Sequence, residues 1–156
     1  MKKSVKIILI IALAGLIIGG GIGLYMYYMP KRDVQATNTD YKVSAAQIVT
    51  EYLSDKDAAN QKYLSDDGDS KVLEITGTVA KISEDYNVNK VVLLKNPDDK
   101  AGVSATFLAE TNQHANQLKP GQTITIKGVI RSGAAYDEDL EMYEHVIVEK
   151  SDIIKK

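Results

Sequence analysis

The sequence predicts a mainly β protein of the α+β class, in which one N-terminal transmembrane helix precedes a five-stranded barrel. Two patterns carry this prediction. Residues 7–29 form a run of 23 positions without a charged side chain. Beyond residue 70, apolar residues recur at every second position, which is the period of a strand. The expected parts are a basic tail (1–6), the transmembrane helix (7–29), a linker (30–43), a helical segment packed on the barrel (44–64) and the barrel itself (71–150).

The charge-free run at residues 7–29 is long enough to cross a membrane. As an α-helix rising about 1.5 Å per residue, it spans a hydrocarbon core about 30 Å thick. Ala12-Leu13-Ala14 resembles a signal-peptidase site, so a cleaved secretory signal is the alternative. The apolar run continues for fifteen positions beyond that site, which a cleaved signal does not need. We therefore expect an uncleaved, single-pass anchor whose partner is the lipid bilayer.

Basic residues on both sides of the run indicate its orientation. Lys2, Lys3 and Lys6 precede it, and Lys31 and Arg32 follow it. Because Lys and Arg favour the cytoplasmic side, the small excess ahead of the run favours a cytoplasmic N-terminus. The remaining chain is then expected to be extracytoplasmic, on the periplasmic side of a cell (inner) membrane.

Three glycines share one face of the expected membrane helix. Gly15, Gly19 and Gly23 recur at every fourth residue. Small residues at this spacing let two helices approach closely in lipid. The pattern predicts a packing face for a homodimer, and the alternative is that glycine is simply common in membrane helices.

The charge of the remaining chain disfavours nucleic acid as a partner. All 21 acidic residues and 16 of the 19 basic residues follow residue 30, which leaves this part with a net charge of −5. Its basic residues are interspersed, whereas a nucleic-acid surface gathers Lys and Arg into a positive patch. The chain has no cysteine, which excludes disulfides, thiolate nucleophiles and zinc–thiolate sites.

Residues 44–64 have the pattern of two short helices. Ser44 and Gln47 have the spacing of a capping box at a helix start. Apolar residues at helical spacing follow in two groups: Ile48, Val49, Tyr52 and Leu53, then Ala58, Ala59, Tyr63 and Leu64 within residues 57–64. A polar stretch at residues 65–70 ends this part.

Five strands and one further helix are expected in the rest of the chain. The strands are predicted at residues 71–83, 88–94, 102–107, 123–131 and 142–149, and the helix at residues 109–118. Residues 84–87 and 132–141 are expected to be loops. Gly77 and Gly128 lie inside the first and fourth strands, where glycine marks a bend or bulge. Five strands with a helix between the third and fourth is the order of an OB-fold.

Three segments of the expected barrel follow a helical region with Tyr52, Ala58 and Tyr63, and they read KVLEITGTV (71–79), GVSATF (102–107) and LKPGQTITIKG (118–128). In this order they resemble the tRNA_anti-like family of OB-fold proteins. The resemblance extends over residues 43–148. It implies a small bacterial protein with an OB barrel behind an N-terminal membrane or lipoprotein signal, and the lack of cysteine excludes the lipoprotein type. Members often have cysteines in the third and last strands, where this chain has Ala105 and His145.

No motif predicts an enzyme, a cofactor or a metal site. His114 and His145 have no carboxylate or second histidine at ligand spacing on the same element. Asp66, Asp67 and Asp69 lie in one loop but do not match an EF-hand, so a solvated turn is favoured over weak Ca²⁺ binding. The chain contains neither a Gly-x-Ser-x-Gly elbow nor a phosphate-binding Gly-x-x-x-x-Gly-Lys loop. The acidic loop at residues 137–144 is expected to be exposed, which does not suit paired catalytic carboxylates.

The candidate binding surface is the face that OB-folds use, with the loops that flank it. The residues there that can stack on a ligand or pair with it are Tyr86, Lys90, Arg131, Tyr136 and Tyr143. The alternative is that these are ordinary solubilising residues. The leading hypothesis is a membrane-anchored, extracytoplasmic, non-catalytic OB module that binds a protein, a peptide or a small envelope ligand. The alternative function is binding of single-stranded nucleic acid or tRNA at the cytoplasmic face of the membrane, and an enzyme is the third hypothesis.

Overall fold

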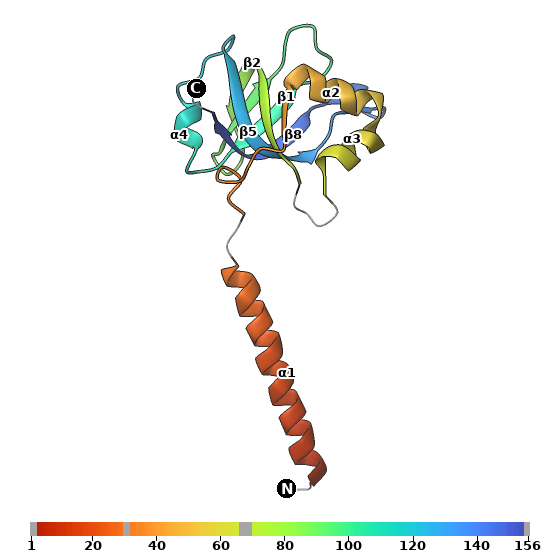
Figure 1. Cartoon of the computed structure of the whole chain (residues 1–156), viewed down its shortest axis with the longest axis vertical. Coiled ribbons are helices and arrows are strands. Elements are labelled where there is room, and N and C mark those ends of the chain that lie inside the picture. The colour runs from red at the N-terminus through yellow and green to blue at the C-terminus, as the bar shows by residue number, and fades with distance from the viewer. Residues whose placement is uncertain (1–2, 30–31, 66–69, 155–156) are drawn as a thin grey trace. The chain divides into compact units, whose positions relative to one another are not determined.

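The computed structural model describes residues 3–29, 32–65 and 70–154 (Figure 1). The chain divides into two compact units, residues 1–32 and 33–156. Predictions that rest on Lys2, Pro30, Lys31 and residues 66–69 lie outside the described residues.

Helix α1 (Lys3–Tyr28) makes up the first unit. Its segment Val5–Tyr28 has a mean hydropathy of 2.7, and none of it is buried inside the structure. It is therefore long and apolar enough to cross a membrane, although an N-terminal signal sequence would pass the same test. A Cβ built on Gly15, Gly19 or Gly23 would meet no atom within 4 Å. Self-association through this face stays a prediction.

The second unit contains a closed barrel of five strands. These strands are β2 (Val72–Glu84), β3 (Lys90–Leu94), β4 (Val103–Phe107), β5 (Thr123–Ser132) and β8 (Val146–Ile153). They pair in the order β2–β3–β4–β8–β5, and β5 pairs again with β2. Only the β4–β8 pair is parallel. A short helix follows β4, so the predicted OB-fold is confirmed, and its last strand extends three residues beyond the predicted end of the barrel at residue 150.

Strand β2 has two partners along one of its edges. Strand β1 (Tyr41–Ser44) pairs in parallel with residues 73–76 of β2, and β3 pairs with residues 79–84. Gly77 lies at the change of partner, where a Cβ would be 2.9 Å from the Cβ of Ala45 and 3.0 Å from that of Leu94. Glycine is needed here because the two neighbouring segments meet over its α-carbon.

The segment expected to be a linker (30–43) is instead held on the barrel from Asp33 onward. Val34 is only 3% exposed. The side-chain amide of Gln35 donates hydrogen bonds to the carbonyl oxygens of Lys127 (3.0 Å) and Lys150 (2.7 Å), and the ammonium of Lys127 donates to the carbonyl oxygens of Gln35 and Thr37. The prediction missed this strap (residues 33–40) because backbone-directed hydrogen bonds hold it, and these leave no apolar periodicity in the sequence.

Two helices follow β1 and pack on the barrel. Helix α2 (Ala45–Ser54) begins as predicted, because the Ser44 hydroxyl accepts a hydrogen bond from the Gln47 N–H at 3.1 Å. Asp55 then caps α3 (Lys56–Tyr63) by accepting from the Ala58 N–H at 2.9 Å. The buried residues of the two helices join the barrel core; they include Ala45, Ile48, Val49, Tyr52, Ala59 and Tyr63.

The helix after β4 is much shorter than the predicted 109–118. Helix α4 comprises only Asn112–Ala115, on the opposite side of the barrel from α2 and α3 in Figure 1. The Thr111 hydroxyl accepts a hydrogen bond from the Leu108 N–H and donates one to the Ser151 carbonyl oxygen at 2.8 Å. Such side-chain bonds to the backbone compete with a helical turn, so residues 109–111 form turns instead.

The predicted fifth strand (142–149) is two strands, and the preceding loop (132–141) contains another. Strands β6 (Ala135–Asp137) and β7 (Met142–Glu144) form a separate hairpin. The chain then breaks at His145, whose Nδ1 accepts a hydrogen bond from the Gly102 N–H at 3.1 Å. Strand β8 begins only afterwards. The prediction included β7 in the fifth strand but missed β6, because the acidic segment around β6 lacks apolar alternation.

Candidate functional site

The five predicted binding residues do not form one surface. Tyr86 is fully exposed in the β2–β3 turn, and Lys90 begins β3, where its ammonium pairs with Glu84. The side chain of Asn112 in α4 forms two hydrogen bonds with this turn. Its amide oxygen accepts from the Lys90 N–H (2.7 Å), and its amide nitrogen donates to the Val88 carbonyl oxygen (3.1 Å). Tyr86 and Lys90 therefore lie at the α4 end of the barrel.

Arg131, in β5, forms an exposed ion pair with a residue of β8. Its guanidinium lies 3.5 Å from the carboxylate of Glu149 in β8, and the two side chains are 70% and 41% exposed. An ion pair this exposed contributes little to stability. It nevertheless keeps the Arg131 side chain over the β5–β8 pair.

Tyr136 and Tyr143 lie together at the other end of β3. They are cross-strand partners in the β6–β7 hairpin, with ring centroids 4.9 Å apart and planes inclined at 56°. The ammonium of Lys100, in the β3–β4 loop, lies 5.4 Å from the centroid of the Tyr143 ring. That distance is within the range of a cation–π contact. The structure thus brings two of the five predicted residues together and adds a lysine to them.

These two tyrosines line a groove of about 530 Å³, which we call the hairpin groove. Its lining residues are Tyr52, Leu53, Lys56, Lys100, Ala134, Ala135, Tyr136 and Tyr143. They come from α2, the first turn of α3, the β3–β4 loop and the hairpin. Lys56 and Lys100 were not among the predicted binding residues, because each lies in a polar stretch of its own and only the tertiary fold brings them to one groove.

The buried side chain of Tyr52 forms part of the groove lining. It is 2% exposed, and a Cβ built on Gly133 would lie 2.0 Å from two carbons of its ring. Burial, followed by the nearby Tyr63 and Glu51, raises the pKa of Tyr52 to about 12. Its hydroxyl has no hydrogen-bond partner among the described residues. The ring is therefore fixed against the backbone that leads into the hairpin, and its hydroxyl keeps its proton.

The rim of the hairpin is acidic. The carboxylate of Asp137 accepts hydrogen bonds from the N–H groups of Asp139 and Leu140, each at 2.9 Å, and so shapes the turn. The other carboxylates here are exposed and belong to Glu138, Asp139, Glu141 and Glu144. The lining of the groove thus has two positive side chains and its rim has several negative ones.

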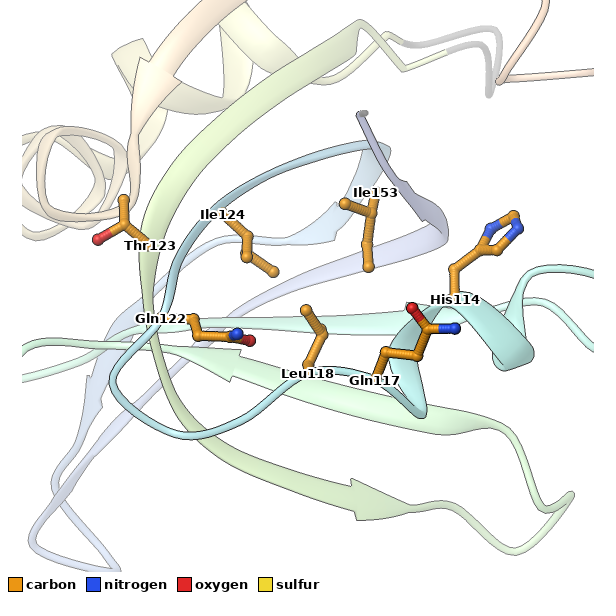
Figure 2. A pocket seen from close by; sticks show the side chains of 7 residues that line it. All are labelled: His114, Gln117, Leu118, Gln122, Thr123, Ile124 and Ile153. Atoms are coloured by element: carbon orange, nitrogen blue, oxygen red, sulfur yellow. The ribbon is translucent and has the colours of Figure 1, made fainter. Parts of the chain in front are cut away.

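A second groove of about 460 Å³ lies beside α4. It is lined by His114, Gln117, Leu118, Gln122, Thr123, Ile124 and Ile153. Figure 2 shows Leu118, Ile124 and Ile153 projecting toward its centre, with the glutamines beside them. The Nδ1 of His114 lies 2.7 Å from a carboxylate oxygen of Asp152. Its lining carries no lysine or arginine, and none of the five predicted binding residues reaches it.

The histidines and carboxylates of the described residues form no group of three or more that could hold a metal ion. His145 is half-buried between the hairpin and the β3–β4 loop. Burial, and then the charge of Lys95, holds the pKa of His145 below its usual value. Its role in the structure is to accept the hydrogen bond from Gly102 that joins the two loops.

Comparison with known proteins gives the family. A family model described as tRNA_anti-like matches residues 1–138, whereas no curated protein matches the sequence. Among solved structures, a lipoprotein of Klebsiella pneumoniae subsp. pneumoniae MGH 78578, proposed to bind nucleic acid, is similar with a TM-score of 0.55 and 15% identity. The match covers 81% of this chain and 100% of the lipoprotein chain, and at this identity it shows the fold alone.

Two further structures are similar over smaller parts. The Stn1–Ten1 complex of S. pombe gives a TM-score of 0.36 and 16% identity, over 55% of this chain and 59% of that chain. Yeast Stn1 and Ten1 give a TM-score of 0.36 and 12% identity, over 79% of this chain and 66% of that chain. Because the family model covers most of the sequence, including four of the five barrel strands, the protein belongs to the tRNA_anti-like family.

Proposed function

We propose that this protein is a membrane-anchored, non-catalytic OB-fold module that binds a protein, a peptide or a small envelope ligand outside the cytoplasm. The observation that carries the proposal is the hairpin groove. The loop between the last two barrel strands is one of the loops with which OB-folds bind ligands. Here that loop holds Tyr136 and Tyr143 beside Lys56 and Lys100.

The composition of the groove supports binding without catalysis. Its lining has no carboxylate, histidine, serine or cysteine among the described residues, so a serine or cysteine nucleophile paired with a histidine or carboxylate base does not face the ligand. Aromatic rings, aliphatic side chains and a few charged groups are the ordinary lining of a binding pocket.

The charges around the groove favour a peptide or protein over a nucleic acid. A single-strand binder combines stacking aromatic residues with a basic groove that follows the phosphates. In this barrel the acidic rim of the hairpin lies next to the tyrosine pair, and it would repel a strand with a phosphate at every nucleotide. A ligand with charges of both signs fits this arrangement better.

Nucleic-acid binding at the cytoplasmic face is the second candidate. The Klebsiella lipoprotein with a similar fold is proposed to bind nucleic acid. Tyr86 lies exposed at the β2–β3 turn, another OB ligand-binding loop, beside the partly buried Lys90, which pairs with Glu84. This function requires the barrel to face the cytoplasm.

A cysteine-accessibility experiment separates the two locations. The chain has no cysteine of its own, so a single Glu110→Cys substitution on the exposed surface beside α4 gives an unambiguous label site. We expect a membrane-impermeant maleimide to label this variant in intact cells, and a Lys2→Cys control to be labelled only after lysis. The reverse pattern would exclude the proposed location.

A direct binding assay tests the ligand class. The full chain in lipid nanodiscs is titrated into fluorescently labelled single-stranded RNA and DNA of about 20 nucleotides, longer than the roughly 4–16 that one OB-fold covers. We expect no tight binding. Micromolar or tighter binding that weakens steeply with salt would replace the proposal by the second candidate.

A further inference from the structure

Two ammonium groups in the hairpin groove lack counter-charges. Neither Lys56 nor Lys100 has an ion pair or a side-chain hydrogen bond among the described residues, apart from the contact of Lys100 with the Tyr143 ring. Among the described residues, Lys42, Lys62 and Lys90 form ion pairs with Glu74, Glu51 and Glu84. The exposed Lys81 and Lys119 also have no ion pair there, as is usual for a solvated side chain. The start of α3 adds nothing to this, because the Asp55 carboxylate already accepts the Ala58 N–H at 2.9 Å and Asp57 lies in the first turn. What sets Lys56 and Lys100 apart is that both line one groove, which suits an anionic group.

The rest of the lining suits an apolar or aromatic side chain. Tyr136 is 49% exposed and rests on Tyr143, while Leu53 and Ala134 add aliphatic surface. The Tyr52 hydroxyl is the one strongly polar group buried in this part without a partner among the described residues. A ligand that fills the groove would cover mostly carbon and meet positive charge.

The carboxylates around the groove limit the negative charge that a bound ligand can carry. Carboxylates of the hairpin rim, including Glu138 and Glu144, are exposed next to the tyrosines. They repel a polyanion but attract basic residues. A ligand with one negative group inside the groove and neutral or basic groups outside it suits both the lysines of the lining and the carboxylates of the rim.

We infer that the hairpin groove binds the carboxyl end of a peptide or protein chain, with its terminal carboxylate held by Lys56 and Lys100 and an apolar last side chain against Tyr136 and Tyr143. This inference rests on the proposed function and names its ligand. A chain terminus places a carboxylate and a side chain on one α-carbon, so both reach a groove of about 530 Å³. The rest of the bound peptide, which passes the acidic rim, then needs no further negative charge.

Calorimetric titration of four short peptides tests the inference on the full chain in nanodiscs. The peptide acetyl-GKGKGF is used with a free carboxyl end and with a C-terminal amide, which differ in a single charge. An amidated peptide with an internal glutamate, acetyl-GKGEGF, separates a terminal carboxylate from a side-chain carboxylate. A free-acid peptide with a polar last residue, acetyl-GKGKGS, tests the apolar side chain.

We expect the free acid ending in phenylalanine to bind about tenfold more tightly than its amide, which is the size expected for two partly exposed charge pairs together. The Lys56→Gln/Lys100→Gln double variant should reduce this ratio below about twofold and leave the amide affinity unchanged. The matched control is Lys81→Gln/Lys119→Gln, which removes two exposed lysines that do not line the groove. It should keep the tenfold ratio.

Each other outcome overturns the inference. Equal affinity for the free-acid and amidated forms of acetyl-GKGKGF means that the groove does not recognise a terminal carboxylate, although the proposed peptide-binding function then still holds. Equal affinity for the internal-glutamate peptide assigns the contact to a side chain. No binding of any peptide at millimolar concentration removes the peptide class from the groove, and tight oligonucleotide binding in the earlier assay removes the proposed function itself.

Discussion

The ring of Tyr52 lies against the backbone of Gly133, so closely that a Cβ at position 133 would be 2.0 Å from two of its carbons. This relationship joins α2 to the segment that enters the β6–β7 hairpin. Tyr52 is buried, and Gly133 is the residue between β5 and the groove-lining Ala134. The position of the hairpin groove thus depends on one residue having no side chain.

Gly133→Ala should destabilise the barrel by about 1–3 kcal/mol, the range for overpacking a tight interior. The measurement is urea unfolding of the full chain in detergent micelles, followed by the near-ultraviolet circular dichroism of the tyrosines. In a Tyr52→Leu background the same substitution should cost less, because the ring that it meets has been removed. Equal costs in both backgrounds would mean that the Tyr52 contact is not the cause.

Tyr52→Phe and Tyr63→Phe form a matched pair with different expected results. The Tyr52 hydroxyl is buried without a partner, so its removal should be neutral or stabilise by up to about 1 kcal/mol. The Tyr63 hydroxyl donates to the Glu51 carboxylate at 2.7 Å, so its removal should destabilise by about 1–2 kcal/mol. Urea unfolding measures both, and equal effects would contradict this difference in hydrogen bonding.

His145 should make the barrel less stable in mild acid. Burial, with a smaller contribution from Lys95, lowers the pKa of His145 in the folded protein, whereas the unfolded chain titrates near the ordinary value of about 6.5. The unfolded state therefore binds the proton first. Stability should be constant above about pH 7 and fall as the pH drops below about 6.5, by at most about 1.4 kcal/mol per pH unit.

The pH effect should be absent in a His145→Asn variant, because its amide oxygen can still accept the Gly102 N–H but does not titrate. Urea unfolding at pH 7.5 and 5.5 gives the comparison. A fall in stability of the same size in this variant would assign the effect to other groups.

Gln35→Ala should loosen the strap. The variant loses the two hydrogen bonds to the carbonyl oxygens of Lys127 and Lys150, which together should cost about 1–3 kcal/mol. Hydrogen exchange followed by mass spectrometry should show faster exchange over residues 33–44 than in the wild type. Gln113→Ala is the control, because the Gln113 side chain is exposed on α4, and it should leave this segment unchanged.

The sequence predicted the barrel because its strands alternate apolar and polar residues. Leu73, Ile75 and Val79 in β2 and Ile126 and Ile130 in β5 are buried as that period requires. The Ser44 cap was also predictable, since it depends only on residues three apart. Features that depend on contacts between distant segments were not. Strand β1 has a single buried residue, Val43, so it shows no period.

The candidate site was predictable only in part for the same reason. Tyr136 and Tyr143 were recognised because aromatic residues in an OB loop are unusual enough to stand out. Lys56 and Lys100 are 44 positions apart in the sequence, and nothing local marks either of them. Arg131 is 70% exposed, so its role in binding stays a prediction, and its neighbour Glu149 is found only once β5 and β8 are paired.

The strap has a mechanical consequence. Strand β1 runs parallel to β2, so tension applied from the N-terminal end of this unit would pull β1 along its neighbour and load their hydrogen bonds in shear. Before that load reaches β1, Gln35 passes part of it to β5 and β8 through the carbonyl groups of Lys127 and Lys150. Tension at Asp33 would therefore be shared among three strands of the barrel, β2, β5 and β8.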